Sequence, residues 1–216
     1  MRFDYLKIIT YRRMSPMTLA KPLIQLTLLE YLQQLASANP TPGGGAVAAI
    51  SLAQAVSLLS MITQLLLKKN KLPAQPTLLT QLAHTLSEML HEALTLAERD
   101  TQVFNHYLLA RQQPASTEID QQKKMSLIHQ ALKDAITVPL RVRELSLQLL
   151  QPQGIIETLK PLVSPYLKSD WTIAKLLSRC AALAAEENIK INLSQISDTD
   201  YNQQIQKHLE EKIPDL

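Results

Sequence analysis

The chain contains 216 residues, and its formal net charge of +3 results from 22 Lys and Arg against 19 Asp and Glu. So small a positive excess, with only 4% aromatic residues, argues against the basic surfaces with stacking aromatics that are typical of nucleic-acid-binding proteins. The length suits one domain with a substantial core. A single cysteine, Cys180, does not require an oxidising compartment, so we expect a cytoplasmic protein.

Glycine is scarce in this sequence. Three of the four glycines are contiguous, at positions 43–45, which leaves too few turn glycines for a β-rich domain of this size. Leu, Ala, Gln and Glu, which favour helices, are abundant. We therefore expect an all-α fold, a bundle of long helices, in which residues 21–216 form a single helical domain and residues 1–20 a loose N-terminal extension.

Helix breakers divide the chain into long helical stretches. In chain order, we expect helices over residues 23–38, 46–69, 77–111, 117–139 with a continuation to 150, 169–187 and 199–212. The first stops at the Pro- and Gly-rich residues 39–45. The fourth starts at a capping box formed by Thr117 and Asp120, and Pro139 should kink or break it. Ser169 is the expected N-cap of the next long helix.

Residues 43–67 contain no charged side chain and are long enough to cross a membrane. At 100° per residue, however, four polar side chains gather on one arc of this helix, and the larger apolar side chains cover the other. The polar arc comprises Gln54, Ser57, Ser60 and Gln64. A lipid-facing helix gains nothing from such an arc, so we interpret this segment as the central helix of a bundle or a dimer.

The loop at residues 40–45 opens directly into that central helix. Its backbone N–H groups lie at the positive end of the helix dipole, where an anion or developing negative charge is stabilised. The loop is not a Walker A motif, because no Gly-Lys-Ser/Thr follows, and it is not a dinucleotide fingerprint, because no strand precedes it. The alternative is a tight turn whose glycines permit positive φ angles or a close approach of helices.

Asp100 is the most informative single residue, because it lies in register with an apolar stripe on the third expected helix. The stripe comprises Leu82, Leu86, Leu90, Ala93, Ala97, Phe104 and Leu108. Burial of a carboxyl group raises its pKa toward the range that is useful for general acid–base catalysis. The alternative is an Asp at the edge of the stripe that reaches solvent or an arginine.

Three further residues are ambiguous on sequence alone. Asp170 follows the expected cap Ser169, where an acid stabilises the helix dipole, yet it also lies near an apolar face that includes Cys180. Asn188 and Asn192 flank a short apolar segment, where capping and turn formation are the simple explanation. The five histidines do not form a metal-ligand spacing, so we predict no metal, and we expect Cys180 to pack rather than react.

Five short segments resemble, in order, the motifs of the cyclodeaminase/cyclohydrolase family, which includes formiminotetrahydrofolate cyclodeaminases and methenyltetrahydrofolate cyclohydrolases. The segments are Pro40-Thr41-Pro42-Gly43-Gly44-Gly45-Ala46-Val47-Ala48-Ala49, Asp100-Thr101-Gln102-Val103-Phe104-Asn105, Val138-Pro139-Leu140, Ser169-Asp170 and Asn188-Ile189-Lys190-Ile191-Asn192-Leu193. The resemblance spans residues 28–198.

The resemblance implies an all-helical homodimer, formed through the central helices, that binds a tetrahydrofolate derivative and needs no other cofactor. It implies either conversion of 5-formiminotetrahydrofolate to 5,10-methenyltetrahydrofolate and ammonia, or hydrolysis of the methenyl compound to 10-formyltetrahydrofolate. Asp100 would be the acid–base residue, with Asp170 second. Substrate-binding residues would be Pro40, Pro42, Gly43, Gly44, Gly45, Phe104, Asn188, Asn192, Lys68 and Lys69, although the two lysines are equally well explained as a solvated helix end.

The sequence departs from the family pattern at three places. Ala46 replaces a serine after the glycines, Val163-Ser164 stands where the family tends to have Gly-Asn, and residues 64–69 keep only the lysines of a longer motif. These departures leave a second hypothesis open, in which the chain is a non-catalytic helical interaction protein that retains the family fold.

Overall fold

The computed structural model describes residues 21–69 and 76–215, so the expected extension at residues 1–20 lies outside the described residues. The elements are η1 (Leu23–Gln25), α1 (Leu28–Leu35), α2 (Gly44–Lys68), α3 (Pro76–Gln112), α4 (Glu118–Leu150), α5 (Ile155–Leu159), η2 (Lys160–Leu162), η3 (Pro165–Leu167), α6 (Lys168–Leu193) and α7 (Thr199–Leu209). Every regular element of this described part is helical, which confirms the all-α prediction.

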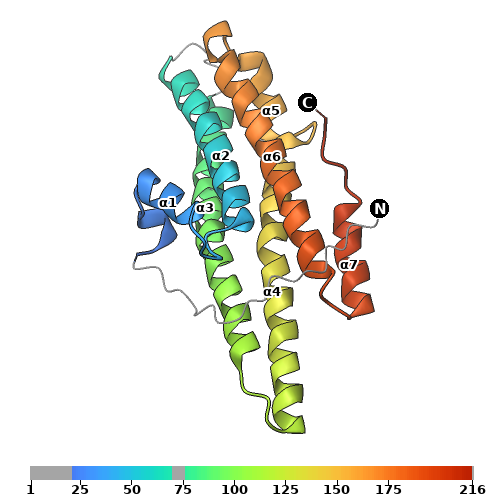
Figure 1. The fold of residues 1–216 in the computed structure, drawn as a ribbon. Coiled ribbons are helices and arrows are strands. Elements are labelled where there is room, and N and C mark those ends of the chain that lie inside the picture. The colour runs from blue at the N-terminus through green and yellow to red at the C-terminus, as the bar shows by residue number, and fades with distance from the viewer. Residues whose placement is uncertain (1–20, 70–75, 216) are drawn as a thin grey trace, which may run out of the picture.

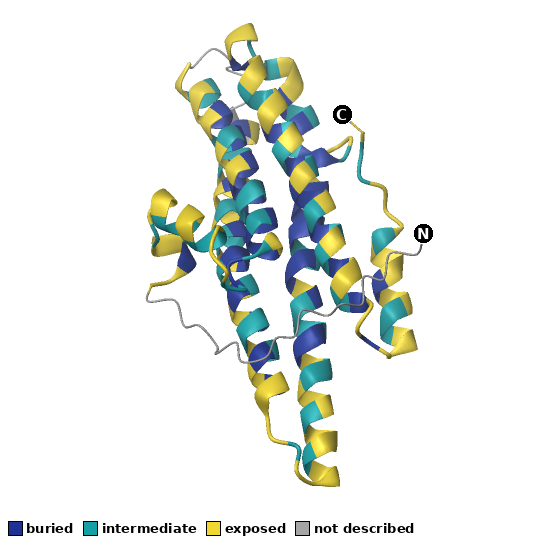
Figure 2. Cartoon of the chain, viewed as in Figure 1, coloured by how far each residue is buried: buried dark blue, intermediate teal, exposed yellow. Residues whose placement is uncertain are grey.

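The four long helices α2, α3, α4 and α6 lie side by side and run in alternating directions (Figure 1). Helix α2 packs against α3 and α6, and α4 packs against the same two helices from the other side. Figure 2 shows that their facing sides are buried. These sides form one core, mainly of Ala, Leu, Ile and Val side chains. The connection between α3 and α4 projects beyond the other helices, and α7 packs beside the end of α6.

Helix α2 is the central helix that the sequence predicted. Among the described residues it alone has the length and composition of a membrane span, with a mean hydropathy of 1.9, but 56% of that window is buried inside the protein. Its buried side is lined by small residues near its start, including Ala46, Ala48 and Ala49. The polar arc is turned outward at Gln54 and Ser57, as expected of a bundle helix.

The first expected helix is wrong in its bounds. Residues 23–25 form a separate 3₁₀ turn, and α1 begins only after Thr27. The reason is a capping box: Thr27 Oγ1 accepts a hydrogen bond from the Glu30 N–H, and the Glu30 carboxylate accepts one from the Thr27 N–H at 2.7 Å. The second capping box, at Thr117 and Asp120, is present as predicted and begins α4.

Pro139 does not break α4, which continues from Glu118 to Leu150 with the proline inside it. A proline has no N–H, so the carbonyl of Ala135, four residues earlier, loses its usual helical donor. Asn192 of α6 replaces that donor, because its Nδ2 donates to Ala135 O at 3.2 Å. The donor that Pro139 cannot provide to the Ala135 carbonyl is therefore provided by a side chain of a neighbouring helix.

We predict that the Asn192→Leu substitution lowers the free energy of unfolding by about 1–3 kcal/mol, because it leaves a partly buried carbonyl without a donor. In a Pro139→Ala background the alanine N–H is available to the same carbonyl, so the loss should shrink by about 1 kcal/mol or more. Urea unfolding of the four proteins measures this coupling. Equal losses in the two backgrounds would contradict the exchange.

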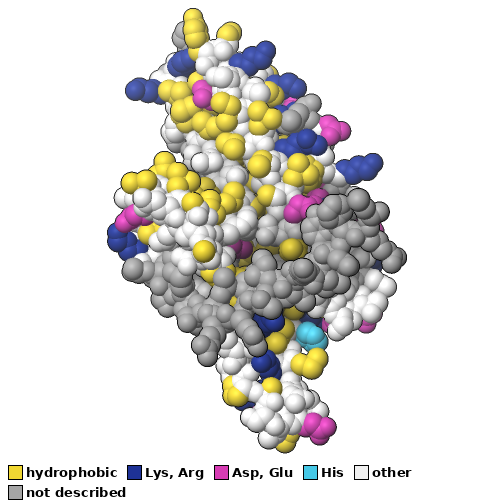
Figure 3. All heavy atoms as spheres, in the orientation of Figure 1, with side chains coloured by type: hydrophobic (Ala, Val, Ile, Leu, Met, Phe, Trp, Pro, Cys, Tyr) yellow, Lys and Arg dark blue, Asp and Glu magenta, His cyan; other side chains and the backbone are white. Residues whose placement is uncertain are grey.

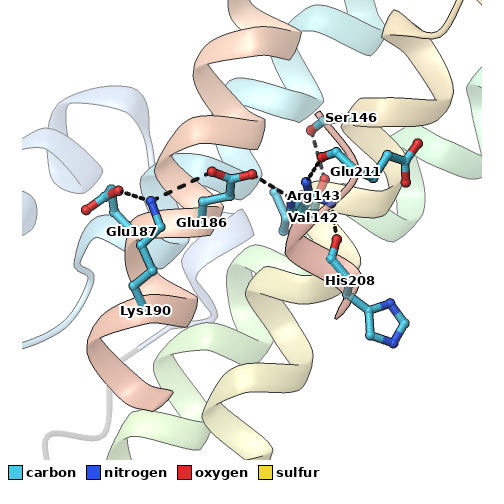
Figure 4. Close-up of polar contacts among 8 residues, drawn as sticks. All are labelled: Val142, Arg143, Ser146, Glu186, Glu187, Lys190, His208 and Glu211. Atoms are coloured by element: carbon cyan, nitrogen blue, oxygen red, sulfur yellow. Dashed lines mark hydrogen bonds and ion pairs between the residues drawn. The ribbon is translucent and has the colours of Figure 1, made fainter. Parts of the chain in front are cut away.

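Arg143 of α4 is only 2% exposed, and it ties the C-terminal residues to the bundle (Figure 4). Its Nε donates to the Glu186 carboxylate of α6 at 2.9 Å. Its remaining nitrogens donate to the backbone carbonyls of His208, at 2.8 Å, and Glu211. The guanidinium thus occupies carbonyls at the end of α7, where a helix lacks its own donors.

We expect Arg143→Leu to lower the free energy of unfolding by about 3–5 kcal/mol, because Glu186, which is 16% exposed, then keeps a largely buried charge without this partner. Arg141→Leu is the matched control. The Arg141 pair with Glu92 has a distance of 2.6 Å but both side chains are more than a third exposed, so its loss should be at most about 1 kcal/mol. Similar losses from the two substitutions in urea unfolding would refute this assignment.

Candidate active site

The first turn of α2 is capped by another helix rather than by its own sequence. Its N-cap residue, Gly43, has no side chain with which to accept a hydrogen bond. The Asp100 carboxylate of α3 accepts one from the backbone N–H of Ala46 instead. A Cβ atom at Gly45 would overlap that carboxylate. No described glycine has a positive φ, so close approach of helices explains Gly45.

Burial raises the pKa of the Asp100 carboxyl to about 6, and the hydrogen bond from the Ala46 N–H opposes this rise. The core-facing register that the apolar stripe predicted for Asp100 is confirmed by its contact with Gly45. A carboxyl group that titrates near neutrality can both accept and donate a proton under physiological conditions.

Asn188 of α6 contacts the same turn, at Gly44. A Cβ atom at Gly44 would be 3.6 Å from Asn188 Nδ2 and 3.7 Å from Oδ1, which is ordinary contact. Asn188 Nδ2 donates to the Ala184 carbonyl at 2.8 Å. Two consecutive glycines are thus flanked by a carboxyl group and a carboxamide from two different helices.

The expected turn around Asn188 and Asn192 is absent, because α6 continues to Leu193 rather than ending near residue 187. Both asparagines lie inside the helix, one turn apart, and both amides bond to backbone carbonyls. Asn192 was predicted to bind substrate, and the structure shows its Nδ2 engaged at Ala135. Asn188 is the asparagine that contacts the glycines.

The loop before α2 contributes a residue that the sequence analysis missed. Thr41 and Pro42 are buried, and the peptide bond between them is cis. Thr41 is 2% exposed, and none of the described residues forms a hydrogen bond with its hydroxyl group. A polar residue between two prolines was the available signal. Phe104 lies one helical turn after Asp100, partly buried, with its ring 6.0 Å from that of Tyr107.

The remaining predicted site residues lie at the opposite end of the bundle. Asp170 is in the first turn of α6, about 27 Å along the helix axis from Asn188 at the usual helical rise. Lys68 and Lys69, both exposed, stand at the far end of α2. Within one chain, therefore, Asp100, the glycines and Asn188 come together, and the lysines and Asp170 do not join them.

Two expectations about α6 are wrong. Ser169 is not its N-cap, because η3 leads directly into a helix that starts at Lys168. Cys180 is exposed rather than packed. The buried side of α6 consists mainly of smaller residues, and the stripe of larger apolar residues faces outward. The buried residues are Ala174, Ser178, Ala181, Ala182, Ala185, Ile189 and Leu193.

Titratable groups elsewhere do not converge as metal ligands do. Over residues 21–69 and 76–215, there is no group of three or more His, Cys, Asp or Glu side chains that could hold a metal ion. At the glycines, the structure brings together a carboxyl group, an amide and the backbone of a helix start.

We predict that Gly45→Ala lowers the free energy of unfolding by about 1–3 kcal/mol, because the new methyl group must displace the Asp100 carboxylate. The neighbouring substitution Gly44→Ala is the control. It meets Asn188 only at ordinary contact distance, and alanine is the better helix former, so stability should hold or rise by up to about 1 kcal/mol. Thermal unfolding of both variants checks this, and an equal loss at the two glycines would contradict the close-approach explanation.

Comparison with known proteins identifies relatives along most of the chain. Residues 27–211 match the formiminotransferase-cyclodeaminase family. A methenyltetrahydrofolate cyclohydrolase from Methylorubrum extorquens is 30% identical over 185 residues, covering 85% of this chain and 87% of that protein. A formimidoyltransferase-cyclodeaminase from Gallus gallus is 25% identical over 201 residues, covering 88% of this chain. The match takes in only 36% of the Gallus protein's length.

One solved structure shows the same fold. The formiminotetrahydrofolate cyclodeaminase from Thermotoga maritima superposes with a TM-score of 0.76 at 26% identity. The match covers 87% of this chain and 88% of that one.

Proposed function

The chain belongs to the formiminotransferase-cyclodeaminase family, and from this premise we propose that it is a folate one-carbon enzyme. The names of the relatives give two reactions, cyclodeamination of formiminotetrahydrofolate and hydrolysis of methenyltetrahydrofolate. Both reactions pass through a tetrahedral carbon held between N5 and N10 of the folate. We propose that this chain catalyses one or both of them, in the cytoplasm and with no cofactor beyond the folate itself.

The observation that carries the proposal is the Asp100 carboxyl group, buried against the start of α2 with a pKa near 6. In cyclodeamination, N10 attacks the formimino carbon and loses its proton. The former imino nitrogen, which enters protonated as =NH2+, gains this proton and leaves as ammonia when its bond to carbon breaks. One carboxyl group that accepts the N10 proton and returns it to the leaving nitrogen serves both steps.

In the hydrolysis reaction, the same Asp100 carboxyl group would again first accept a proton and then donate one. Water adds to the methenyl carbon and loses one proton, which is released. The hydroxyl group that remains loses its proton as the formyl carbonyl forms and the bond from that carbon to N5 breaks, and N5 takes up a proton to give 10-formyltetrahydrofolate. The net release of one proton per turnover is consistent with the cationic charge of the methenyl substrate. Asp100 would accept the proton from water and deliver one to N5.

We further propose a homodimer that forms through α2 and α6. Apolar side chains of both helices are exposed in the single chain, and Figure 3 shows hydrophobic side chains gathered over the upper part of the face where these helices lie in Figure 1. They include Met61, Leu65, Ile173, Leu176 and Leu183. An antiparallel two-fold pairing of this face would bring the Lys68 and Asp170 end of one protomer toward the glycine loop of its partner.

The test is incubation of the purified protein with 5-formiminotetrahydrofolate and, separately, with 5,10-methenyltetrahydrofolate. The methenyl chromophore should rise with the first substrate or fall faster than a blank with the second. As a base, Asp100 must be ionised, so kcat/KM should be low below pH 5 and reach a plateau above its pKa of about 6. No change with either compound, from a folded protein, would support the non-catalytic hypothesis instead.

We expect Asp100→Asn to lower kcat by about 10²–10⁴-fold, because the amide cannot exchange a proton. Glu88→Gln, an exposed position on the same helix, is the control that should leave the rate unchanged. An Asp100→Asn variant with the full rate and the original pH profile would exclude the acid–base role.

A further inference from the structure

The orientation of the Asn188 amide is determined by its surroundings. Nδ2 lies 2.8 Å from the Ala184 carbonyl oxygen. A carbonyl can only accept, so the nitrogen must face it, and the flipped amide would place two acceptors together. The hydrogen bond that Asn188 forms with Ala184 uses one N–H of Nδ2 and does not involve Oδ1. The oxygen and the second N–H of the amide are therefore the groups that can meet another partner.

This oxygen lies beside an accessible part of the candidate site. Gly44, which Asn188 contacts, is exposed, whereas the next residue, Gly45, is buried under Asp100. Adjacent Cα atoms are separated by ~3.8 Å, and Asn188 and Asp100 flank two adjacent glycines. When Asp100 is ionised, both side chains present acceptor oxygens, and the second N–H of the Asn188 amide is the donor that remains beside them.

The reacting groups of the two substrates differ in what they offer to such acceptors. The formimino group carries N–H donors on the nitrogen that leaves, whereas the reacting carbon of the methenyl compound is bonded to two ring nitrogens that carry no hydrogen. A site with two acceptors therefore binds the first reacting group with hydrogen bonds that the second cannot form. An unpaired polar group is what makes a site reject an analogue that lacks the matching donor.

We propose that Asn188 is a specificity-determining residue, whose Oδ1 accepts a hydrogen bond from the formimino N–H of the substrate and so favours cyclodeamination over hydrolysis. This inference rests on the proposed folate activity. It assigns to Asp100, at Gly45, the proton transfers and to Asn188, at Gly44, the recognition of the leaving nitrogen. The Ala184 carbonyl acts as the anchor that keeps the acceptor oxygen facing the ligand.

The experiment compares kcat/KM for both substrates in the wild type, Asn188→Leu and Asn188→Gln. Asn188→Leu has a similar volume and no acceptor, so the ratio of formimino to methenyl kcat/KM should fall about tenfold or more, mostly through a higher KM for the formimino substrate. Asn188→Gln keeps an amide with both a donor and an acceptor oxygen, so it should retain more of the ratio than Asn188→Leu. Ile191→Ala, an exposed position on α6, should leave the ratio unchanged.

Each other outcome overturns the inference. An equal fall for both substrates would mean that Asn188 supports the shared pterin or the fold. A larger fall with the methenyl compound would mean that it positions water. An unchanged ratio would remove it from recognition altogether. A wild type that turns over neither folate would instead refute the proposed function, so the two failures are distinguishable.

Discussion

The contact between Asp100 and the first turn of α2 is the constraint on which the rest of the site depends. The start of a buried helix needs an acceptor for its free N–H groups, and a buried carboxyl group needs a donor. The Asp100 carboxylate accepts a hydrogen bond from the Ala46 N–H, so both requirements are met by one contact. The carboxylate can come this close only because the preceding residue, Gly45, has no side chain. The same lack of side chains lets Asn188 approach from α6. Helix packing and acid–base chemistry thus rely on one short stretch of backbone.

The spans of α2, α3 and α4 and the buried side of Asp100 could be predicted from the sequence, because both depend on local information. Breakers mark the ends of helices, and an apolar stripe fixes which side of a helix is buried. Pro139 could not be understood locally, because the donor that replaces its missing N–H comes from Asn192, distant in the sequence. The prediction that Cys180 is packed was wrong for another reason. Mainly small residues line the buried side of α6, so the larger apolar side chains indicated the exposed face instead.

The geometry also explains how the departures from the family pattern are accommodated. Ala46 stands where the family tends to have a serine, but the contact with Asp100 is made by the backbone N–H, which alanine supplies equally well. Val163 and Ser164 lie just before η3, at the end of the bundle far from Asp100. The predicted site residues form two groups in space, because the site includes residues from both ends of α2 and from both ends of α6.

The Arg143 cluster has a consequence for the order in which the fold is completed. When α4 and α6 pack together before residues 208–211 have docked, Arg143 has the Glu186 carboxylate as a partner but lacks the two backbone carbonyls. Water must remain beside that group until residues 208–211 arrive and replace it. The last helix is therefore a closing element: it seals a charge that the earlier helices enclose, and the bundle reaches its dry, finished state only when its C-terminal residues dock.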